Sequence, residues 1–257
     1  MRATALPNLL RLIYRNIAVN TDPGSLVILV GLPGLYLVFF GYGFASIAPG
    51  GGSTSYLSFL TPGILAFQVV MAGTVGGSML WADRRWGMLS QLLVGPFTRL
   101  QYLLGIMLTS VLFGLAGTAV MLAVAFVLIG SVPTGALALG TIFGAIILGS
   151  IFFGSVMLLL AALVKSNTAY NSLQVLLIFV VNFASTVFYP LSGRLPLVLQ
   201  ALFVINPLTY VADGVRGAYA GTMSASDVYQ LGILALETAV VLFLAVRAYL
   251  RTDVSYE

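Results

Sequence analysis

Residues 135–164 read GALALGTIFGAIILGSIFFGSVMLLLAALV, and the stretch holds no charged side chain. About 20 consecutive apolar residues are enough for an α-helix to cross the hydrocarbon core of a bilayer. Inside lipid only helices and closed barrels satisfy every backbone hydrogen bond, and barrel strands are roughly ten residues of alternating polarity. The stretch therefore predicts a transmembrane helix. Its small residues four apart, including Gly140 and Gly144, predict close packing against other helices.

The rest of the chain has the same character. Of its 257 residues, 60% are hydrophobic and 7% are charged, and the mean hydropathy is +1.08. Such a chain cannot cover itself with polar surface in water, so we predict an all-α polytopic membrane protein with a single domain over residues 1–257. Six apolar segments are long enough to be transmembrane helices: about 25–46, 57–80, 102–130, 135–164, 169–190 and 228–250.

The N-terminal segment, residues 5–21, is amphipathic. Its apolar positions recur at helical spacing, namely Leu10, Ile13, Tyr14 and Ile17, while Arg11 and Arg15 occupy another face. We expect an interfacial helix on an anionic leaflet, with an ordinary juxtamembrane start to the first span as the alternative. The arginines also argue against a cleavable signal peptide, whose central region is apolar.

The basic residues set the expected orientation. With a cytoplasmic N-terminus, nine of the eleven lie in inner segments, and only Arg194 and Arg216 lie outside. The positive-inside rule then places both termini in the cytoplasm.

Residues 191–225, on the outer side, form a long and largely apolar connection. We expect an extracellular re-entrant pair of short helices, about 195–204 and 208–219, which turns at Asn206 and Pro207. Tyr210 belongs to the second of them, where Asp213 and Arg216 are spaced for an i, i+3 ion pair that holds the element in place. A seventh span is the alternative, but it would weaken the charge asymmetry.

An inner connection, LWADRRWGMLSQLLVGPFTRLQ (residues 80–101), gathers charge beside two tryptophans. We expect a short helix over 82–94, ended by Pro96, with one face on the membrane domain and the other free for a partner. Trp86, Leu89 and Leu93 would form the first face, and the second would carry Asp83, Arg84, Ser90 and Gln91. The pattern fits a lipid-surface helix or a docking helix equally well.

The chain lacks the residues that several kinds of catalysis and metal binding require. The chain has no cysteine and no histidine, which removes thiol chemistry, the commonest metal ligand and the usual proton shuttle. Its one lysine, Lys165, does not belong to a phosphate-binding G-x-x-x-x-G-K-[ST] loop. The fragment DGVRGAY (213–219) matches the motif of phosphatidyl-alcohol transferases only in part. We therefore expect no enzyme activity and no cofactor or metal in this chain.

A few polar residues remain within the expected spans. They are Gln68, Asn171, Gln174, Asn182 and Glu237. They are candidates for a substrate path, with hydrogen bonding between helices as the alternative. An ionisable group such as Glu237 inside a membrane is by default a functional candidate, although a carboxyl bonded to a neighbouring helix is an equal alternative.

Four segments together resemble the membrane subunit of type-2 ABC exporters, a family of drug-resistance, nodulation-factor and polysaccharide exporters. They are YLSFLTPGILAF (56–67), DRRWGMLSQLLVGP (83–96), LLGIML (103–108) and NPLTYVADGVRGAYAG (206–221). The resemblance implies that residues 82–94 are a coupling helix, which docks on a separate ATP-binding subunit through Asp83, Arg84, Arg85, Trp86, Met88, Leu89 and Gln91. It also implies two copies of that subunit, which carry ATP and Mg²⁺, and a permease homodimer in the inner (plasma) membrane of a prokaryote.

The chain departs from this family at two docking positions. The family commonly has glutamate in place of Arg85, and an acidic residue or lysine in place of Ser90. A more basic docking surface predicts a more acidic groove in the partner.

Three functions follow as hypotheses. The first is an exporter permease for a hydrophobic or amphiphilic molecule such as a drug, a lipid or a lipid-linked glycan, with membrane lipid and no nucleic acid among its partners. The second is a secondary transporter or channel that uses Glu237 as an ion or proton site, which would predict inverted repeats that the sequence does not display. The third is a scaffold subunit without a transport path.

Overall fold

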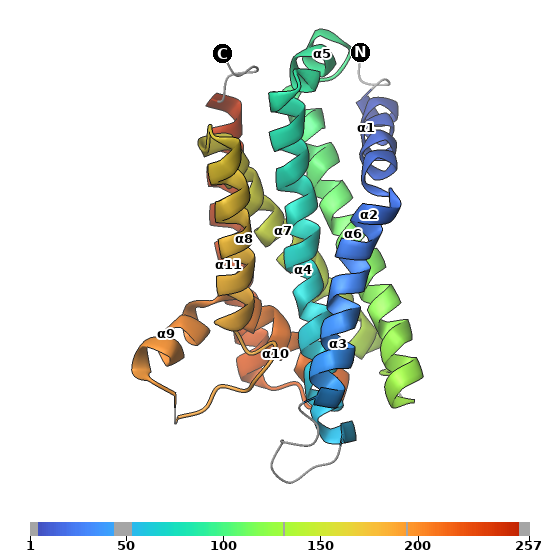
Figure 1. Cartoon of the computed structure of the whole chain (residues 1–257), viewed down its shortest axis with the longest axis vertical. Helices are drawn as coiled ribbons and strands as arrows, with labels where there is room; N and C mark the ends of the chain where they lie inside the picture. Colours follow the sequence, from blue (N-terminus) through green and yellow to red (C-terminus); the bar gives the residue numbers. More distant parts are fainter. Residues whose placement is uncertain (1–4, 44–52, 131, 194, 252–257) are drawn as a thin grey trace.

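The computed structural model describes residues 5–43, 53–130, 132–193 and 195–251, and these are built from helices without any strand (Figure 1). The all-helical prediction is therefore confirmed for the described chain. In order, the helices are α1 Ala5–Asn20, α2 Pro23–Leu26, the π-helix η2 Val27–Gly31, α3 Leu32–Gly43, α4 Ser53–Arg85, α5 Met88–Val94, α6 Arg99–Ile129, α7 Ala136–Leu163, α8 Asn167–Phe183, α9 Leu197–Ile205, α10 Pro207–Ala220 and α11 Ala225–Arg251.

The bundle has two distinct ends (Figure 1). The short helix α5, the first turn of α1 and the last turn of α11 lie at one end, which we call the α5 end. The helices α9 and α10 lie at the opposite end. This arrangement places the charged stretch beside the beginning of the first helix and the end of the last.

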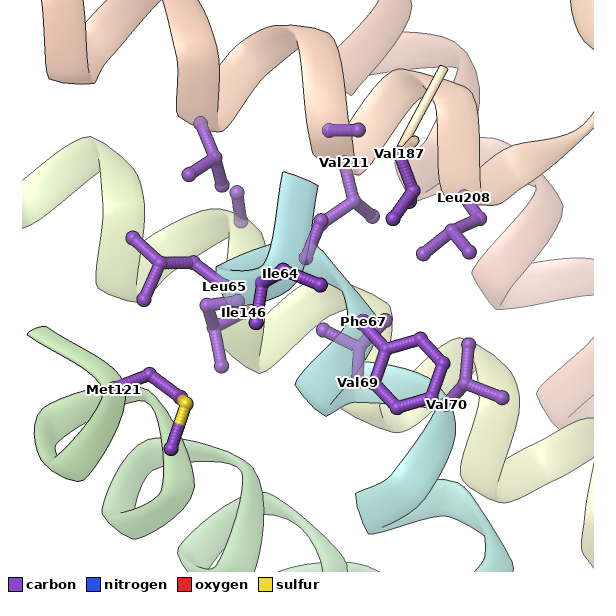
Figure 2. Close-up of a cluster of buried hydrophobic side chains, with 14 of the residues drawn as sticks. Ile64, Leu65, Phe67, Val69, Val70, Met121, Ile146, Val187, Leu208 and Val211 are labelled. Carbon is purple, nitrogen blue, oxygen red and sulfur yellow. The ribbon is translucent and has the colours of Figure 1, made fainter. Parts of the chain in front are cut away.

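The helix α4 forms the centre of the bundle, where it packs against α3, α6, α7 and α10. Most apolar side chains in its middle, Ile64 and Val69 among them, are fully buried. Figure 2 shows how Met121 of α6, Ile146 of α7 and Val211 of α10 surround them. Because α4 is apolar around its whole circumference, it belongs inside a bundle and not on its surface.

Two glycines of α4 allow its close approach to α7. A Cβ atom at Gly77 would lie 2.6 Å from the Cβ of Met157, and one at Gly73 would lie 2.7 Å from the carbonyl carbon of Phe153. By contrast, a Cβ at Gly140 or Gly144 would meet no atom within 4 Å. Small residues of α7 do pack closely, since a Cβ at Gly149 would lie 3.0 Å from Val69 of α4 and Val211 of α10, but Gly140 and Gly144, also expected to pack, make no such contact within this chain.

Four helices are long and apolar enough to cross a membrane: α4, α6, α7 and α11. The pair α9 and α10 adds a fifth crossing if it is counted as one span broken by a 73° bend. The expected first span is divided, because the chain forms α2, the π-helix η2 and then α3, and its end at 44–46 lies outside the described residues. The π-helical turn ends two residues before Pro33, whose ring cannot fit inside a regular helix.

The expected fifth span, 169–190, is too long by several residues, because α8 ends at Phe183. Side chains provide the reason. The Asn206 side-chain amide donates to the carbonyls of Val181 and Ala184, at 2.7 Å each, and the Ser185 hydroxyl donates to the Asn182 carbonyl at 2.7 Å. These bonds satisfy the carbonyls that a helix leaves unpaired at its C-terminus, so the chain can turn there.

The helices α9 and α10 lie where the sequence predicts a pair of short helices, with Asn206 between them. The Asn206 side chain also accepts a hydrogen bond from the Leu208 backbone N–H at 3.0 Å and so caps α10, while Pro207 takes the first helical position. The Tyr210 hydroxyl donates to the Val204 carbonyl at 2.6 Å, which ties α10 back to α9.

The predicted ion pair of α10 is present. The Arg216 guanidinium bonds Asp213 at 2.6 Å and the Thr186 carbonyl at 2.7 Å, and it lies 4.2 Å from the centre of the Phe59 ring. The Thr186 hydroxyl donates to the same carboxylate at 2.8 Å. The pair therefore fixes α10 to α4 and to the segment after α8.

Candidate functional site

The charged stretch does not form one helix over 82–94, so that prediction is wrong. Its first four residues are the last turn of α4, which ends at Arg85. Gly87 then adopts a left-handed backbone conformation with φ +70°, and α5 begins at Met88. A residue at such a φ is usually glycine, and here it ends one helix and starts the next. The Ser90 hydroxyl donates to the Gly87 carbonyl at 2.6 Å and closes the turn.

This break changes which side chains face outward. Trp86, which the helical spacing placed beside Leu89 and the family resemblance placed in the docking set, is 76% exposed, and Val94 at the other end of α5 is 90% exposed. Leu89, which the helical spacing placed on the inner face and the family resemblance placed in the docking set, is only 3% exposed and faces the bundle. Met88 and Gln91 are exposed between them, and the Arg85 guanidinium lies 5.6 Å from the centre of the Trp86 ring. We call the exposed set Arg85, Trp86, Met88, Gln91 and Val94 the α5 tip.

Asp83 and Arg84 do not belong to that surface. Both were expected on the outward face, but they are 6% and 5% exposed. The reason for Asp83 is a set of partners inside the bundle. Its carboxylate accepts two bonds from the Arg15 guanidinium, at 2.5 and 2.7 Å, and one from the Tyr102 hydroxyl at 2.7 Å. The bond to Asp83 raises the pKa of Arg15, so this cation stays charged.

Arg84 turns the opposite way, toward α7. Its guanidinium donates to the Ala161 carbonyl at 2.7 Å, in the last turn of that helix. A cation at a helix C-terminus interacts favourably with the carbonyls left unpaired there. One turn earlier in α4, the Trp81 indole donates to the Asn167 side chain at 2.9 Å and its ring stacks on Tyr170 at 4.6 Å.

Together these contacts form a belt of bonds directly beneath the α5 tip. Asp83 joins α4 to α1 and α6, Arg84 joins it to α7, and Trp81 joins it to α8. Asn8 of α1 also donates to the Pro96 carbonyl, at 3.1 Å, just after α5. The end of α4 below the tip is therefore bonded to four other helices of the bundle.

Arg15 and Tyr102 are parts of this belt that the sequence argument missed. A signal existed, since Asp22 and Asp83 are the only acidic residues among the first 212. A lone carboxylate beside a membrane span needs a cationic partner. Spacing could not identify Arg15 as that partner, because it is 68 residues away.

The five candidate path residues do not come together. Gln174 and Asn182 of α8 line one cavity of about 320 Å³, which α3 and α4 complete with Tyr36, Phe67 and other apolar side chains. Gln68 is buried elsewhere, against Gly117 of α6, and Asn171 is exposed on α8.

Glu237 of α11 lines a separate cavity of about 330 Å³, beside Phe152 and Pro207. Within the described part of the chain, its Oε2 atom is buried without a hydrogen-bond partner. The sites at α8 and at α11 are therefore different places in the fold.

Comparison with known proteins identifies the family. The sequence matches the family described as "ABC-2 type transporter" over residues 9–220. The chain belongs to the ABC-2 type transporter family. It is also 34% identical over 211 residues to "Putative transport permease ycf38" of Porphyra purpurea, covering 78% of this chain and 69% of that one. The proteins of the same name from Cyanophora paradoxa and Pyropia yezoensis are 29% and 31% identical, over 86% and 77% of this chain and 77% and 68% of theirs.

Membership confirms the resemblance drawn from the four sequence segments. An ABC-2 permease is the transmembrane component of an ABC transporter and works with an ATP-binding subunit. The α5 tip is part of the matched region, as are the belt residues Arg15, Asp83 and Tyr102.

Proposed function

We propose that this chain is one of two identical permease subunits of an ATP-driven exporter. Two ATP-binding subunits, which carry ATP and Mg²⁺, would drive it between inward- and outward-facing states. The cargo would be a hydrophobic or amphiphilic molecule, such as a drug-like compound, a lipid or a lipid-linked glycan.

The α5 tip is the observation that carries the proposal. An exposed tryptophan with neighbouring methionine and valine side chains, rimmed by Arg85 and Gln91, has the composition of a protein-binding hot spot. It projects from the end of α4 and is anchored by the Asp83 and Arg84 bonds below it. The docking surface we propose is therefore the α5 tip, without Asp83, Arg84 and Leu89, whose role is to hold the tip in place.

We further propose six membrane crossings in each subunit, with α3 and α8 as the two short ones. The α5 end would face the cytoplasm of a prokaryotic cell, because it carries most of the basic residues. The helix α1 would lie at the inner surface, where its exposed Leu10 and Tyr14 would contact lipid. The helices α9 and α10 would form the outer re-entrant pair.

For the substrate path we propose the cavity at α3, α4 and α8. Its lining is mostly aromatic and aliphatic, with the two amides of Gln174 and Asn182 as polar points. Pockets of this kind suit a molecule that is largely apolar and carries a few hydrogen-bonding groups.

The first test is co-purification of the tagged chain from its native membrane, followed by identification of the ATP-binding subunit and measurement of its ATPase activity in lipid nanodiscs. Trp86→Ala and Val94→Ala should weaken the association. Loss of a tryptophan at a hot spot costs about 2 kcal/mol, or roughly 30-fold in affinity. Leu197→Ala is the matched control, because Leu197 is 82% exposed at the opposite end of the bundle.

The control separates docking from general disturbance of an exposed apolar side chain. Equal loss of association in the Leu197 and Trp86 variants would contradict the docking role of the tip. Failure to capture any ATP-binding subunit with the unchanged chain would contradict the exporter proposal as a whole. Stimulation of the captured ATPase by particular amphiphiles would identify the class of cargo.

A further inference from the structure

A basic cavity of about 570 Å³ opens between α7 and α11 near the α5 end. Four cations line it: Arg84 from α4, Lys165 from just after α7, and Arg247 and Arg251 from the last turns of α11. The rest of its lining is aliphatic, with Leu163 and Leu244 among the side chains. No acidic residue is among the described residues that line it.

Such a concentration of charge is unusual in this chain, where only eleven residues are basic. Over the described ranges, Lys165, Arg247 and Arg251 take part in no ion pair, whereas Arg15 and Arg216 each have a carboxylate. Cations that converge without a counter-ion repel one another, and this repulsion is relieved when an anion binds between them. The site therefore fits a ligand with negative charge.

The aliphatic half of the cavity restricts the ligand further. Leu163 is exposed at the end of α7 and Leu244 is exposed on α11, one turn from Arg247 toward the middle of the bundle. The cations thus lie at the end of two membrane helices, and the apolar side chains lie on the membrane side of them. A ligand that fits both halves has an anionic head group at the membrane surface and a hydrocarbon chain along the helices.

We propose that this cavity is a binding site for the phosphate head group of an anionic membrane phospholipid. Lys165, Arg247 and Arg251 would bind the phosphate, and Leu163 and Leu244 would contact the first part of the acyl chains. The proposal does not rest on the proposed transport function, since it requires only that α7 and α11 cross a membrane.

The site would also bear on the α5 tip. Arg84 lines the cavity and at the same time bonds the end of α7, next to Asp83 in the belt. A phosphate bound here would add negative charge beside Arg84 and would stabilise the arrangement in which α4, α7 and α11 meet. Lipid composition could thus act on the junction that carries the tip.

The test uses the purified full chain in a neutral detergent, titrated with phosphatidylglycerol or with phosphatidylcholine and read by native mass spectrometry. The unchanged chain should bind phosphatidylglycerol more tightly. Arg247→Gln and Lys165→Gln should each reduce its affinity about fivefold, the contribution of one cation near a membrane surface, and leave phosphatidylcholine binding unchanged. Arg247→Lys, which keeps the charge, should restore most of the binding and shows that the fold is intact.

The matched control is Arg11→Gln, which removes an exposed cation from α1 at the same end of the bundle. Its affinity for phosphatidylglycerol should stay within about twofold of the unchanged chain, since it does not line the cavity. An equal loss in the Arg11 and Arg247 variants would overturn the proposal, because it would indicate general surface attraction.

A titration with inorganic phosphate alone distinguishes a membrane lipid from free phosphate as the source of the bound phosphate group. If it displaces phosphatidylglycerol from the chain, or raises the melting temperature of the chain as much as the lipid does, the site serves a soluble phosphate and the lipid proposal is wrong. If it does neither, the aliphatic half of the cavity contributes to binding, as the proposal requires.

Discussion

The bond between Arg15 and Asp83 should be a main support of the α5 end, and a double-mutant cycle can measure it. Asp83→Ala removes a carboxylate that accepts three hydrogen bonds, and it leaves Arg15 and the buried Tyr102 hydroxyl without their acceptor. Removing one partner of a fully buried ion pair costs about 3–5 kcal/mol. The Arg15 side chain is still 26% exposed in the folded protein, so water can hydrate its guanidinium after Asp83→Ala and reduce the cost.

We therefore expect Asp83→Ala to lower the free energy of unfolding by about 2–3 kcal/mol. Arg15→Ala should cost at least as much, because it leaves the Asp83 carboxylate, whose side chain is only 8% exposed, without a counter-charge. The two changes together should cost less than their sum, with a coupling energy of about 2 kcal/mol for the two charge-assisted bonds.

The assay is equilibrium unfolding of the purified chain in mixed micelles, titrated with sodium dodecyl sulfate. The control cycle combines Asp83→Ala with Arg11→Ala, one helical turn before Arg15 and exposed. Its coupling energy should be close to zero. A coupling energy below about 0.5 kcal/mol for Arg15 and Asp83 would refute the reasoning, since that is the spread expected for independent sites.

Three further predictions concern other parts of the molecule. Gly77→Ala should cost about 1–3 kcal/mol in the same unfolding assay, because the added methyl group overlaps Met157, whereas Gly140→Ala, with open space around it, should be neutral or stabilising. Equal effects of the two changes would contradict the close approach of α4 and α7. Asn206→Ala should lower the free energy of unfolding by about 3 kcal/mol, since it removes two hydrogen bonds to the end of α8 and the cap of α10. A loss of less than about 1 kcal/mol would show that α8 ends for another reason. Glu237→Gln should leave ATP-driven transport in proteoliposomes intact, because neither the α5 tip nor the α8 cavity includes this residue, and abolished transport would favour the ion-coupled alternative.

The long helices could be predicted from the sequence because their cause is local. An uncharged run such as residues 135–164 has to satisfy its own backbone in lipid, and α7 ends within a residue of the predicted limits. The end of α8 could not be predicted in this way. It depends on the Asn206 side chain, which reaches back from more than 20 residues later.

The sequence placed the α5 tip correctly along the chain, but it did not predict which side chains of the tip are exposed. Helical spacing placed Trp86 with Leu89 on one face, and that argument assumes an unbroken helix. Gly87 breaks it, and a glycine in a helical pattern does not by itself show whether the chain bends. Likewise, Asp83 looked like a surface charge because its partners Arg15 and Tyr102 belong to other helices.

The unbroken course of α4 from the α9 end to the tip has a mechanical consequence. At about 1.5 Å per residue, its 33 residues, which include Pro62, make a helix about 50 Å long, so a tilt of only about 5° about one end would displace the other by roughly 4 Å. Gly87 comes directly after this helix, and the bonds of Asp83 and Arg84 hold the last turn of α4 against its neighbours, so a displacement of the tip would act on α4 at its end. A displacement of the tip would then reach the opposite end of α4 only to the extent that the helix tilts as one body, and Pro62 is the place in its interior where it can bend.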